Sequence, residues 1–568
     1  MAAHTEAALK TLLRSTGLDR WLTRGRSAGR LLVNRRYRRL QQRQWAEYLA
    51  WRRHAAALRP SLWPAGTAPR RALIVAKGTV HGAQIELGLI KALELAGFRA
   101  VVLCEPWLDK FFRLGGVTEF VRWVDPTEAH AVAAKARVAQ AATIDDLLDV
   151  QHCGARVGKF AASTAFRSLR VGRLDLSLAA TQAALTTHLA AGMARADAAV
   201  RLVNRLKPDL ALFMGNRYTG QSELMDICID AGVDVLTWFD AHRSSSLMLK
   251  RYRRDNRDWH HGSIADASWR MLQRMPWGQS QQQALDREIG GGYASGDWYS
   301  RGGTQVNKTI VDADALAARL GLDRGKKTAV IFPHIVWDAT LFWGTDLYSN
   351  YEDWLVATVG AACRNPRLNW IVKIHPAHVS KSAMERYAGE PAEITAMRER
   401  IGQLPPHIRV VAPDTDINTY SLFPLMDYCL TVRGTIGIEA AAMGKRVLTA
   451  GSGRYDRRGF TIDSETRAQY LERLDHLETI APPTAQEVDL ARRFAYGAFV
   501  VRPLPLSAWS ITHDTDIEAT TRVAFVAPTS DAVRHSPDMQ AVARWALNRE
   551  QEDFLWLPDE LLPQRARA

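Results

Sequence analysis

The stretch Cys429–Thr449 constrains the fold of this chain more than any other segment. It has the pattern of a short buried strand, a Gly-Thr-Ile-Gly turn, an alanine-rich helix and a second strand, which predicts a βαβ unit. The first turn of such a unit lies at the carboxyl ends of the strands, where open α/β sheets bind ligands. Gly434 and Gly437 place no Cβ in the way of an approaching group. The N–H groups of Thr435, Ile436 and Gly437 can therefore face an anion at the start of the helix.

Glu439 lies one turn into the same predicted helix. From there its carboxylate could accept hydrogen bonds from the two hydroxyls of a ribose. The turn can also be a tight strand-to-helix connection whose glycines serve packing alone, because short glycine-rich turns are weak motifs by themselves. Features elsewhere in the sequence are needed to choose between a ligand-binding turn and a turn that serves packing alone.

The composition is that of a large globular protein. The 568 residues suffice for three or four domains, and they are 47% hydrophobic and 24% charged. No apolar run of about 18 residues and no secretory signal is present, which predicts a protein that neither spans a membrane nor is secreted. The five cysteines lie far apart without a CxxC or Cys/His cluster. This spacing predicts reduced cysteines, no metal site and a cytoplasmic location.

The positive charge is concentrated near the N-terminus. Residues 1–60 hold fourteen Lys or Arg against three acidic residues, so the rest of the chain carries only +3 of the net charge of +14. Hydrophobic residues recur at helical spacing between these arginines, as at Trp45, Tyr48 and Leu49. A basic amphipathic helix with aromatic anchors suits an anionic membrane surface, here the inner face of the cytoplasmic membrane. The alternatives are helices packed on the main body and a nucleic-acid contact, and we predict no nucleic acid because no recognised module follows.

Strand and helix patterns alternate in two halves after a proline-rich linker. Strands of the first half are predicted at 71–76, 100–104, 209–214 and 233–239. Strands of the second half are predicted at 328–332, 369–374, 408–412, 429–432 and 446–449. Residues 251–310, which contain Gly290-Gly-Gly292, are expected to be irregular, and so is the tail after residue 500.

These patterns predict an α/β protein with two doubly wound, Rossmann-like lobes. The predicted division is a basic helical extension over 1–66, an N-terminal lobe over 67–300, a C-terminal lobe over 301–482, and a helix and tail over 483–568 that pack back on the lobes. Two such lobes that face one another place a ligand in the cleft between them.

Four short motifs follow one another in the second half: Phe332–Asp338, Tyr351–Leu355, Val372–Pro376 and Arg433–Ala440. Their order resembles that of bacterial capsule and surface-polysaccharide biosynthesis glycosyltransferases. The His-Pro motif with a later Gly-Thr is also similar to that of Kdo transferases and sialyltransferases, which use CMP-activated sugars. The resemblance is clearest over residues 325–505. It implies a GT-B fold in which a sugar passes from a nucleotide-sugar donor on the C-terminal lobe to a capsular polysaccharide, or its glycolipid acceptor, on the N-terminal lobe.

The resemblance also implies roles for residues of the C-terminal lobe. His375 is expected to contact the donor phosphate, with Pro376 fixing the turn and Lys373 adding positive charge on the same strand face. Thr435 and its neighbouring amides would hold the same phosphate, and Glu439 the ribose.

Three further polar residues of this lobe are candidates. His334 and Asp338 follow its first strand and could line the cleft. Arg433 could pair with the phosphate or with a neighbouring carboxylate.

A general base for the acceptor hydroxyl is expected on the N-terminal lobe. His81 and Glu86 follow its first strand, and Asp240 and His242 follow a later one, where a mutual hydrogen bond could tune the last two. The acceptor-lobe signature of sialyltransferases is absent. His81, Glu86 and Asp240 therefore remain equal candidates.

Three other functions stay open at this point. A CDP-glycerol-type glycerophosphotransferase shares the His-Pro motif, and a non-hydrolysing sugar-nucleotide epimerase shares the two-lobed architecture. A non-catalytic scaffold or binding protein would depend on the basic arm instead. No cofactor is predicted for any of the enzymatic functions considered, because two-lobed enzymes can stabilise a phosphate with amides and cationic side chains.

Overall fold

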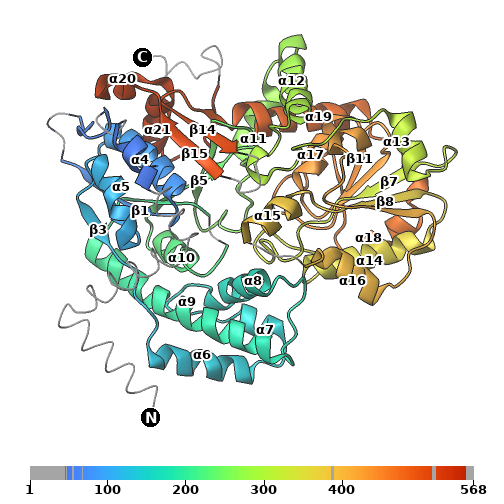
Figure 1. The fold of residues 1–568 in the computed structure, drawn as a ribbon, viewed down its shortest axis with the longest axis horizontal. Coiled ribbons are helices and arrows are strands. Elements are labelled where there is room, and N and C mark those ends of the chain that lie inside the picture. Colours follow the sequence, from blue (N-terminus) through green and yellow to red (C-terminus); the bar gives the residue numbers. More distant parts are fainter. Residues whose placement is uncertain are drawn as a thin grey trace.

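The computed structural model describes residues 45–46, 48–53, 57–64, 66, 68–215, 217–385, 389–514 and 520–557. Two sheets form two lobes that lie side by side along the long axis of the molecule (Figure 1). Most of the predicted basic arm falls outside the described residues. Residues 45–46 and 48–53 of this arm are helical; Trp45 is exposed, and Trp51 is buried against Phe525.

The sheet of the N-terminal lobe has the strand order β3-β2-β1-β4-β5-β6-β13. Its first five strands are parallel, whereas β6 and β13 are antiparallel additions at one edge. The strands are β1 (Arg70–Val75), β2 (Phe98–Leu103), β3 (Glu119–Val121), β4 (Leu210–Phe213), β5 (Asp234–Asp240), β6 (Ser246–Tyr252) and β13 (Leu504–Pro505).

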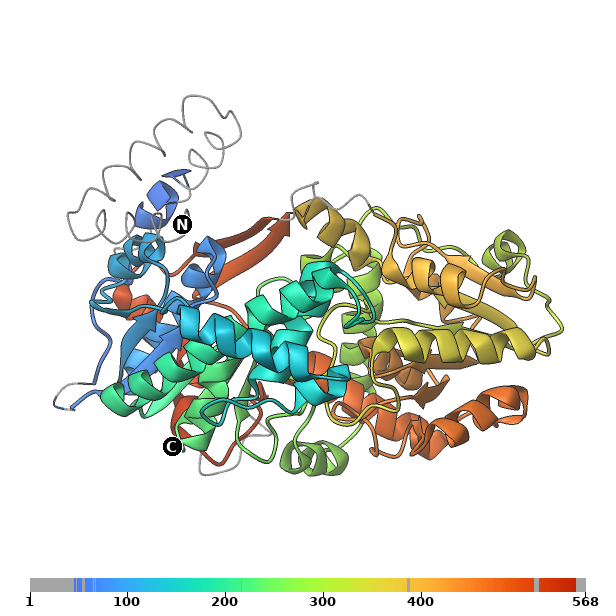
Figure 2. The same ribbon diagram turned by 90° about the horizontal axis from the view of Figure 1, so that it is seen from below.

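Helices cover both faces of this first sheet. They are η2 (Pro106–Leu108), α4 (Val80–Leu95), α5 (Asp109–Leu114), α6 (Glu128–Gln140), α7 (Ile144–Leu148), α8 (Val157–Leu169), α9 (Ala179–Leu206) and α10 (Ser222–Asp230). Figure 2 shows α6, α8 and α9 stacked along one side of the lobe. Helix α4 lies on the opposite face of the sheet (Figure 1).

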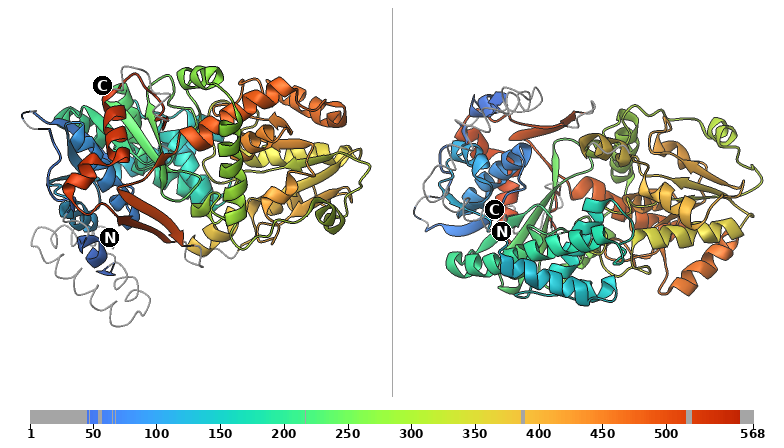
Figure 3. Two further views of the ribbon diagram at one scale, coloured as in Figure 1. Left: turned by 90° about the horizontal axis from the view of Figure 1, so that it is seen from above. Right: turned by 60° about the horizontal axis from the view of Figure 1, so that its bottom comes forward.

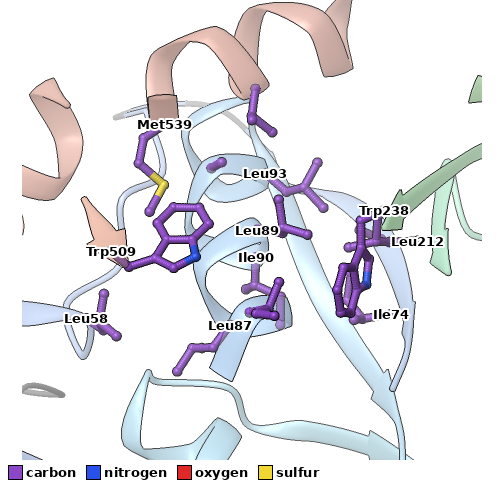
Figure 4. Packing of buried hydrophobic residues seen from close by; sticks show 14 of the residues in the cluster. Leu58, Ile74, Leu87, Leu89, Ile90, Leu93, Leu212, Trp238, Trp509 and Met539 are labelled. Carbon is purple, nitrogen blue, oxygen red and sulfur yellow. The ribbon is translucent and has the colours of Figure 1, made fainter. Parts of the chain in front are cut away.

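Alternate residues of β1 explain why helices are needed on both faces. Ile74 shares a hydrophobic core with Leu89 and Ile90 of α4 (Figure 4), whereas Leu73 and Val75 join the core on the α9 side. A parallel strand that is buried on both faces reads as a continuous apolar run, as this one does.

The sheet of the C-terminal lobe has the order β12-β11-β10-β7-β8-β9 and is parallel throughout. Its strands are β7 (Thr328–Ile331), β8 (Asn369–Lys373), β9 (Ile408–Val411), β10 (Tyr428–Thr431), β11 (Arg446–Thr449) and β12 (Ile462–Asp463). Its helices are α13 (Ala313–Leu320), α14 (Tyr351–Arg364), α15 (Ala377–Glu385), α16 (Ala392–Arg400), η4 (Thr419–Leu422), α17 (Thr435–Ala442), α18 (Arg467–Asp475), η5 (Leu477–Thr479) and α19 (Ala485–Tyr496).

Local signals account for the ends of these helices. The Asn350 side chain caps α14 by accepting the N–H of Asp353 at 2.7 Å, as its position before the helix predicts. Gly444, with φ of 74°, ends the turn after α17. The predicted βαβ unit at residues 429–449 is present as β10, α17 and β11.

The segment between the lobes is more regular than the sequence predicts. Residues 251–310 contain two helices, α11 (Asp266–Arg274) and α12 (Gln279–Ser295), followed by the short η3 (Ser300–Gly302). The triple glycine at 290–292 lies inside α12. A Cβ on Gly292 would come within 2.7 Å of the Trp298 ring, so close packing explains at least this glycine.

The C-terminal tail is also ordered and returns to the N-terminal lobe. After α19 the chain forms η6 (Gly497–Val501), β13, the hairpin of β14 (Trp509–Asp514) and β15 (Thr520–Phe525), and helices α20 (Ser530–His535) and α21 (Pro537–Leu547). Figure 3 shows the red hairpin on the N-terminal lobe and the orange α19 beside the C-terminal lobe. The prediction of an irregular tail is therefore wrong.

Two buried basic residues of β6 hold this tail. The Lys250 ammonium lies 2.9 Å from the Asp553 carboxylate, and both side chains are inaccessible to solvent. The Arg251 guanidinium donates to the carbonyl oxygens of Trp545 and Asn548 at the end of α21, at 3.1 and 2.7 Å. A cation at a helix C-terminus satisfies carbonyls that have no intrahelical donor.

The two sheets define two doubly wound, Rossmann-like lobes, as predicted. Each sheet has a point where the strand order reverses, between β1 and β4 in one lobe and between β7 and β10 in the other. Ligands of open α/β sheets bind at such points. The predicted domain boundaries at residues 66, 300 and 482 remain predictions.

Candidate functional site

A cavity of about 570 Å³ lies between the two lobes. Strand-end loops of both lobes line it, together with the segment that connects them. Its polar and turn-forming lining residues include Arg167, Arg217, Tyr218, Asp240, His260, His261, Tyr293, Tyr299, Arg301, His334, Asp338, Tyr351, Lys373, His375, Pro376, Lys381, Arg433, Gly434, Thr435, Ile436, Glu439 and Arg454.

The N-terminus of α17 opens into this cavity. Gly434 is the N-cap and has no side chain to satisfy the first amides of the helix. Thr435 and Ile436 line the cavity, and as first-turn residues their N–H groups have no intrahelical acceptor. With the positive end of the helix dipole behind them, these amides form a site suited to an anion.

Gly437 has a different role from the one predicted. Its N–H donates to the Gly434 carbonyl at 3.0 Å, so it is not available to a ligand. A Cβ at this position would lie 2.2 Å from the Tyr455 hydroxyl oxygen, which itself donates to the Gly434 carbonyl at 2.8 Å. The glycine therefore serves packing of the turn against Tyr455.

His375 follows β8 and projects from the next turn. Its Nδ1 accepts the N–H of Ala377 at 3.1 Å, so the proton of the neutral ring is on Nε2. Burial, with help from Lys381 and other nearby basic groups, lowers the pKa of His375 to about 3. His375 is therefore a neutral hydrogen-bond donor.

Lys373 lies at the end of β8 and is almost fully buried. Its ammonium donates to the carbonyl oxygens of Ile374 and Ala412, at 3.1 and 3.3 Å, and burial lowers its pKa to about 7. The predicted Pro376 also lines the cavity, at the start of the turn into α15. Lys373 has no carboxylate partner among the described residues, which leaves its charge for a bound anion.

Arg433 pairs with a protein carboxylate. Its guanidinium contacts Asp346 and the carbonyl of Trp343. Its backbone N–H donates to Nε2 of His334 at 3.2 Å, and the His334 ring stacks on Tyr351 with centroids 4.4 Å apart. Of the two predicted options, the structure thus places Arg433 with a carboxylate, while His334 supports the turn that precedes α17.

Asp338 joins the two lobes across the cavity. It accepts from Arg167 of α8 at 2.8 Å and from the Tyr218 hydroxyl, both on the N-terminal lobe. On its own lobe it contacts the Lys381 ammonium. Burial opposes ionisation, but Lys381 and Arg167 outweigh it and hold the pKa of Asp338 well below its usual range. Asp338 is therefore an ionised link between the lobes.

Glu439 reaches the cavity from one turn inside α17. Its carboxylate accepts from the Tyr293 hydroxyl of α12, and burial raises its pKa to about 7. The Tyr299 hydroxyl is hydrogen-bonded to Thr435 and Arg454, beside the start of the helix. The connecting segment therefore completes the wall at the first turn of α17.

Of the three predicted base candidates, Asp240 lines the cavity. Its carboxylate contacts Arg301, and its Oδ1 has no hydrogen-bond partner among the described residues. Burial would raise the pKa of Asp240, but the charges of Arg301 and Lys77 outweigh it and lower the pKa. The group is therefore a carboxylate with one free oxygen.

His81 and Glu86 lie behind this wall and do not line the cavity. His81 Nε2 is 3.0 Å from the Lys77 ammonium, and burial together with that charge lowers its pKa to about 3. Glu86 is fully buried and accepts the N–H of Lys77 at 2.8 Å, and burial raises its pKa to about 8. Both residues support the loop after β1.

His242 does not bond to Asp240 as the sequence suggested. It is buried, and its Nε2 lies 2.7 Å from the Glu288 carboxylate of α12. Two residues along an irregular segment are enough to turn the side chain away from the cavity. The predicted Asp-His pair is absent.

Sequence reasoning missed several residues of the cavity wall. Arg217 follows β4 and Arg454 follows β11, so both lie at strand ends of opposite lobes, and no ion pair joins either of them to a described carboxylate. His260 and His261 come from the segment expected to be irregular, and Nδ1 of His261 has no partner among the described residues. A basic residue in the loop after a predicted strand was the available signal for the two arginines.

Two Rossmann-like lobes with a cavity in the cleft between them have a GT-B-like architecture. Within it, residues 296–479 match the family model of the capsule polysaccharide biosynthesis proteins. The matched segment contains all strands of the C-terminal lobe.

One curated relative is Protein FixF of Sinorhizobium fredii, 29% identical over 148 residues. The alignment spans 23% of this chain and 31% of FixF, so about a third of the relative's length is matched.

Solved structures with detectable likeness are more distant. KpsC, a beta Kdo 2,4 transferase of Thermosulfurimonas dismutans, has 13% identity and a TM-score of 0.32, over 58% of this chain and 87% of that one. A UDP complex of MnaA from S. aureus has 12% identity and a TM-score of 0.27, over 75% and 91%. Similarities at this level carry no conclusion about substrate. None of the described helices combines the length and apolar character needed to span a bilayer.

Proposed function

We propose that this protein is a glycosyltransferase that passes a sugar from a nucleotide-activated donor to a growing capsular or surface polysaccharide, or to its lipid-linked acceptor. The observation that carries the proposal is that the α17 N-terminus, His375 and Arg454 line one cavity, and that Arg454 has no carboxylate partner among the described residues. Amides and cations of this kind stabilise a departing phosphate. The match of residues 296–479 to the family model of the capsule polysaccharide biosynthesis proteins supports the polysaccharide as the product.

The charge of the cavity supports a donor with a phosphate. Lys373, Arg217 and Arg454 line it without a described carboxylate partner. Burying cations without a counter-charge is costly, and a bound anion removes that cost. Because Arg217 and Arg454 belong to opposite lobes, a phosphate bound to both would hold the cleft closed.

His375 acts in this proposal as a hydrogen-bond donor to the leaving phosphate. Its Nε2–H is fixed by the bond from Ala377 to Nδ1, and an approaching phosphate raises the pKa of the ring, because an opposite charge favours the imidazolium. The α17 amides take the rest of the charge that develops as the glycosidic bond breaks. Glu439 lies one turn away, where it can accept from a ribose hydroxyl.

Asp240 is the proposed base for the acceptor hydroxyl. It lies on the N-terminal wall of the same cavity and keeps one carboxylate oxygen without a described partner. Removing the acceptor proton in the transition state is the task of such a group in an inverting transfer. Arg301 then holds the carboxylate in place.

Thermal shift with nucleotides tests the proposal directly. Wild type and His375→Ala are each titrated with CMP, CDP, UDP and GDP. One nucleotide is expected to raise the Tm of wild type and to have a weaker effect on the variant, since a ligand that binds only the folded state stabilises it by mass action. A Tm that none of the four changes would remove the main support for a nucleotide-sugar enzyme.

An assay of the reaction products distinguishes a glycosyltransferase from the other two candidate enzymes. Turnover of the nucleotide sugar without any acceptor would instead indicate a sugar-nucleotide epimerase, and preference for CDP-glycerol a glycerophosphotransferase. Loss of function on deletion of residues 1–44 with full activity of His375→Ala would indicate a non-catalytic binding protein.

Residues 1–60 are proposed to hold the enzyme at an anionic membrane surface. Their excess of arginine supports this, since each basic residue near anionic headgroups adds about 1 kcal/mol. Cosedimentation with anionic but not with neutral vesicles, lost on deletion of residues 1–44, is the expected result.

A further inference from the structure

Away from the cavity, side chains with metal-binding atoms meet on the helical side of the N-terminal lobe. His152 and Cys153 lie in the tight turn before α8, and Asp197 lies in the second half of α9. One ligand atom of each, an imidazole nitrogen, the thiol sulfur and a carboxylate oxygen, lies within 4.8 Å of the other two. Figures 1 and 2 show that α8 and α9 run beside each other here, so residues 44 positions apart are brought together by the helix packing.

Two donors converge on a single oxygen in this cluster. His152 Nε2 lies 2.8 Å and Cys153 Sγ 3.2 Å from Oδ1 of Asp197. In the ion-free state each of these contacts needs a proton between the two atoms. A cation that binds imidazole nitrogen, thiolate and carboxylate can replace both protons at once, and Zn²⁺ prefers this set of ligands.

A fourth residue orients the carboxylate. Nδ1 of His130 accepts the N–H of Thr127 at 3.1 Å, so its proton is on Nε2. That Nε2–H lies 3.0 Å from Oδ2 of Asp197, the oxygen that the other two side chains leave free. Histidine–carboxylate contacts of this kind fix ligand orientation around protein metal ions.

The arrangement is not that of a cysteine nucleophile. In such sites the imidazole lies between the thiol and the carboxylate, takes the thiol proton and is held by the acid. Here Asp197 lies between Cys153 and His152 and accepts from both. The geometry thus favours a shared cation over proton transfer from the thiol to the ring.

We propose that His152, Cys153 and Asp197 bind a Zn²⁺ ion, with His130 as a positioning residue and water at the fourth position. On binding, the Cys153 thiol releases its proton to solvent as the Zn–S bond forms, and His152 offers the Nε2 lone pair with its proton on Nδ1. The side chains of His152 and Asp197 are 32% and 30% exposed, so an ion can reach them from solvent. The proposed site departs from the prediction of no metal site that was made from the sequence.

The ion would fix the start of α8 to α9. Helix α8 carries Arg167, which bonds to Asp338 across the cleft, so the site lies on the element that joins the N-terminal lobe to its partner lobe. The function of the ion is structural in this proposal, and it is independent of the reaction proposed for the cavity.

Cobalt substitution tests the site without an activity assay. Tag-free protein is stripped with a chelator and titrated with Co²⁺, which shows a thiolate charge-transfer band in the near ultraviolet and strong visible bands when tetrahedral. We expect both bands in wild type, their displacement by Zn²⁺, and loss of the charge-transfer band in Cys153→Ser. Cys363→Ser is the matched control, because Cys363 is a partly exposed thiol outside the cluster and should leave both bands unchanged.

Two further variants test the remaining roles. His152→Ala is expected to abolish tetrahedral Co²⁺ binding, whereas His130→Gln should keep the bands and weaken Zn²⁺ binding by about ten- to a hundredfold. Zn²⁺ should raise the Tm of wild type and not that of Cys153→Ser. A wild type without the charge-transfer band, or a Cys153→Ser variant that keeps it, would overturn the proposal.

Discussion

Nδ1 of His375 accepts a hydrogen bond of 3.1 Å from the N–H of Ala377, which leaves the proton of the neutral ring on Nε2. This bond comes from the turn that follows β8 and depends on no other side chain. The ring can therefore meet a ligand in a set orientation as soon as the turn is formed.

Replacing His375 by alanine should reduce kcat/KM for sugar transfer at least about 100-fold, because the departing phosphate loses a hydrogen-bond donor. His375→Gln, which keeps an N–H donor, should retain more activity than His375→Ala. Steady-state kinetics with saturating acceptor measures both. His476→Ala, a change at an exposed histidine of the same lobe, is the control and should match wild type.

Removing Arg217 or Arg454, which have no carboxylate partner among the described residues, should weaken donor binding. Arg454→Met and Arg217→Met are each expected to raise the nucleotide Kd about 10- to 100-fold, the range for a hydrogen bond to a charged group. Isothermal titration calorimetry measures the change. Arg457→Asn alters an exposed arginine of the same loop as Arg454 and should bind as wild type. Equal affinity of Arg454→Met and wild type would contradict the phosphate site.

The Asp240→Asn variant tests whether Asp240, and not a nearby residue, is the general base. The variant should lose about 10²- to 10⁴-fold in kcat with little change in nucleotide affinity, since the carboxylate contributes to proton removal and not to donor binding. His81→Ala, behind the cavity wall, should affect kcat much less. If His81→Ala were as damaging as Asp240→Asn, the base would have to be sought in the loop after β1.

Gly437→Ala should destabilise the protein by about 1–3 kcal/mol, because the new Cβ displaces Tyr455 from a packed position. Nucleotide binding should weaken as well, since Tyr455 holds the turn before α17 through Gly434. Gly360→Ala in α14 is the matched control, because its Cβ meets no atom within 4 Å, and it should be neutral or stabilising. Denaturant unfolding compares the two, and equal stability of both variants would refute the packing role.

Because Glu86 is buried, we expect the stability of the folded protein to depend on pH. Burial raises its pKa to about 8 from the ordinary 4.5, so between these values the folded protein holds a proton that the unfolded chain has lost. Stability therefore falls as pH rises through this window, by at most about 1.4 kcal/mol per pH unit, and levels off above pH 8.

Glu86→Gln removes this effect while it keeps an acceptor for the Lys77 N–H. The Tm of the variant relative to wild type should therefore increase from pH 5 to pH 8. Glu472→Gln, at an exposed glutamate, should show no such trend. A constant difference between Glu86→Gln and wild type over this range would show that the residue does not titrate there.

Most of the parallel sheets could be predicted from the sequence, because strands buried on both faces form continuous apolar runs that alternate with helical patterns. Helix α12 could not, since three consecutive glycines carry a helix-propensity cost of about 1 kcal/mol each. The burial of Ile289 and Tyr293 on either side of those glycines outweighs that cost, and only the folded structure shows it.

The strands of the C-terminal tail could not be predicted from the sequence for a related reason. In the hairpin, Trp509 and Ile511 of β14 lie opposite Phe525 and Val523 of β15, and all four side chains are buried. The alternation of buried and exposed residues in each strand is too short to distinguish the strand from a loop in the sequence. These strands are stable because they cover α4, 400 residues away in the sequence, and local pattern carries no information about such a contact.

For the candidate site, the β10–α17 turn and the His-Pro segment were accessible to sequence reasoning because each is local. The partners of these residues were not. Asp346 for Arg433, Tyr293 for Glu439 and Arg301 for Asp240 lie 60 to 150 residues away and meet only after both lobes and their connection have formed.

The return of residues 504–554 to the first lobe sets a time order for biosynthesis. Strand β6 emerges from the ribosome before both of its partners in the tail: Lys250 precedes its counter-ion Asp553 by 303 residues, and β6 precedes its sheet partner β13 by roughly 250 residues. At translation rates of about 5–20 residues per second, this delay is about 10–50 s. During that time the N-terminal half has an open sheet edge at β6 and a Lys250 without its counter-ion, and such an unpaired strand edge can pair with another chain.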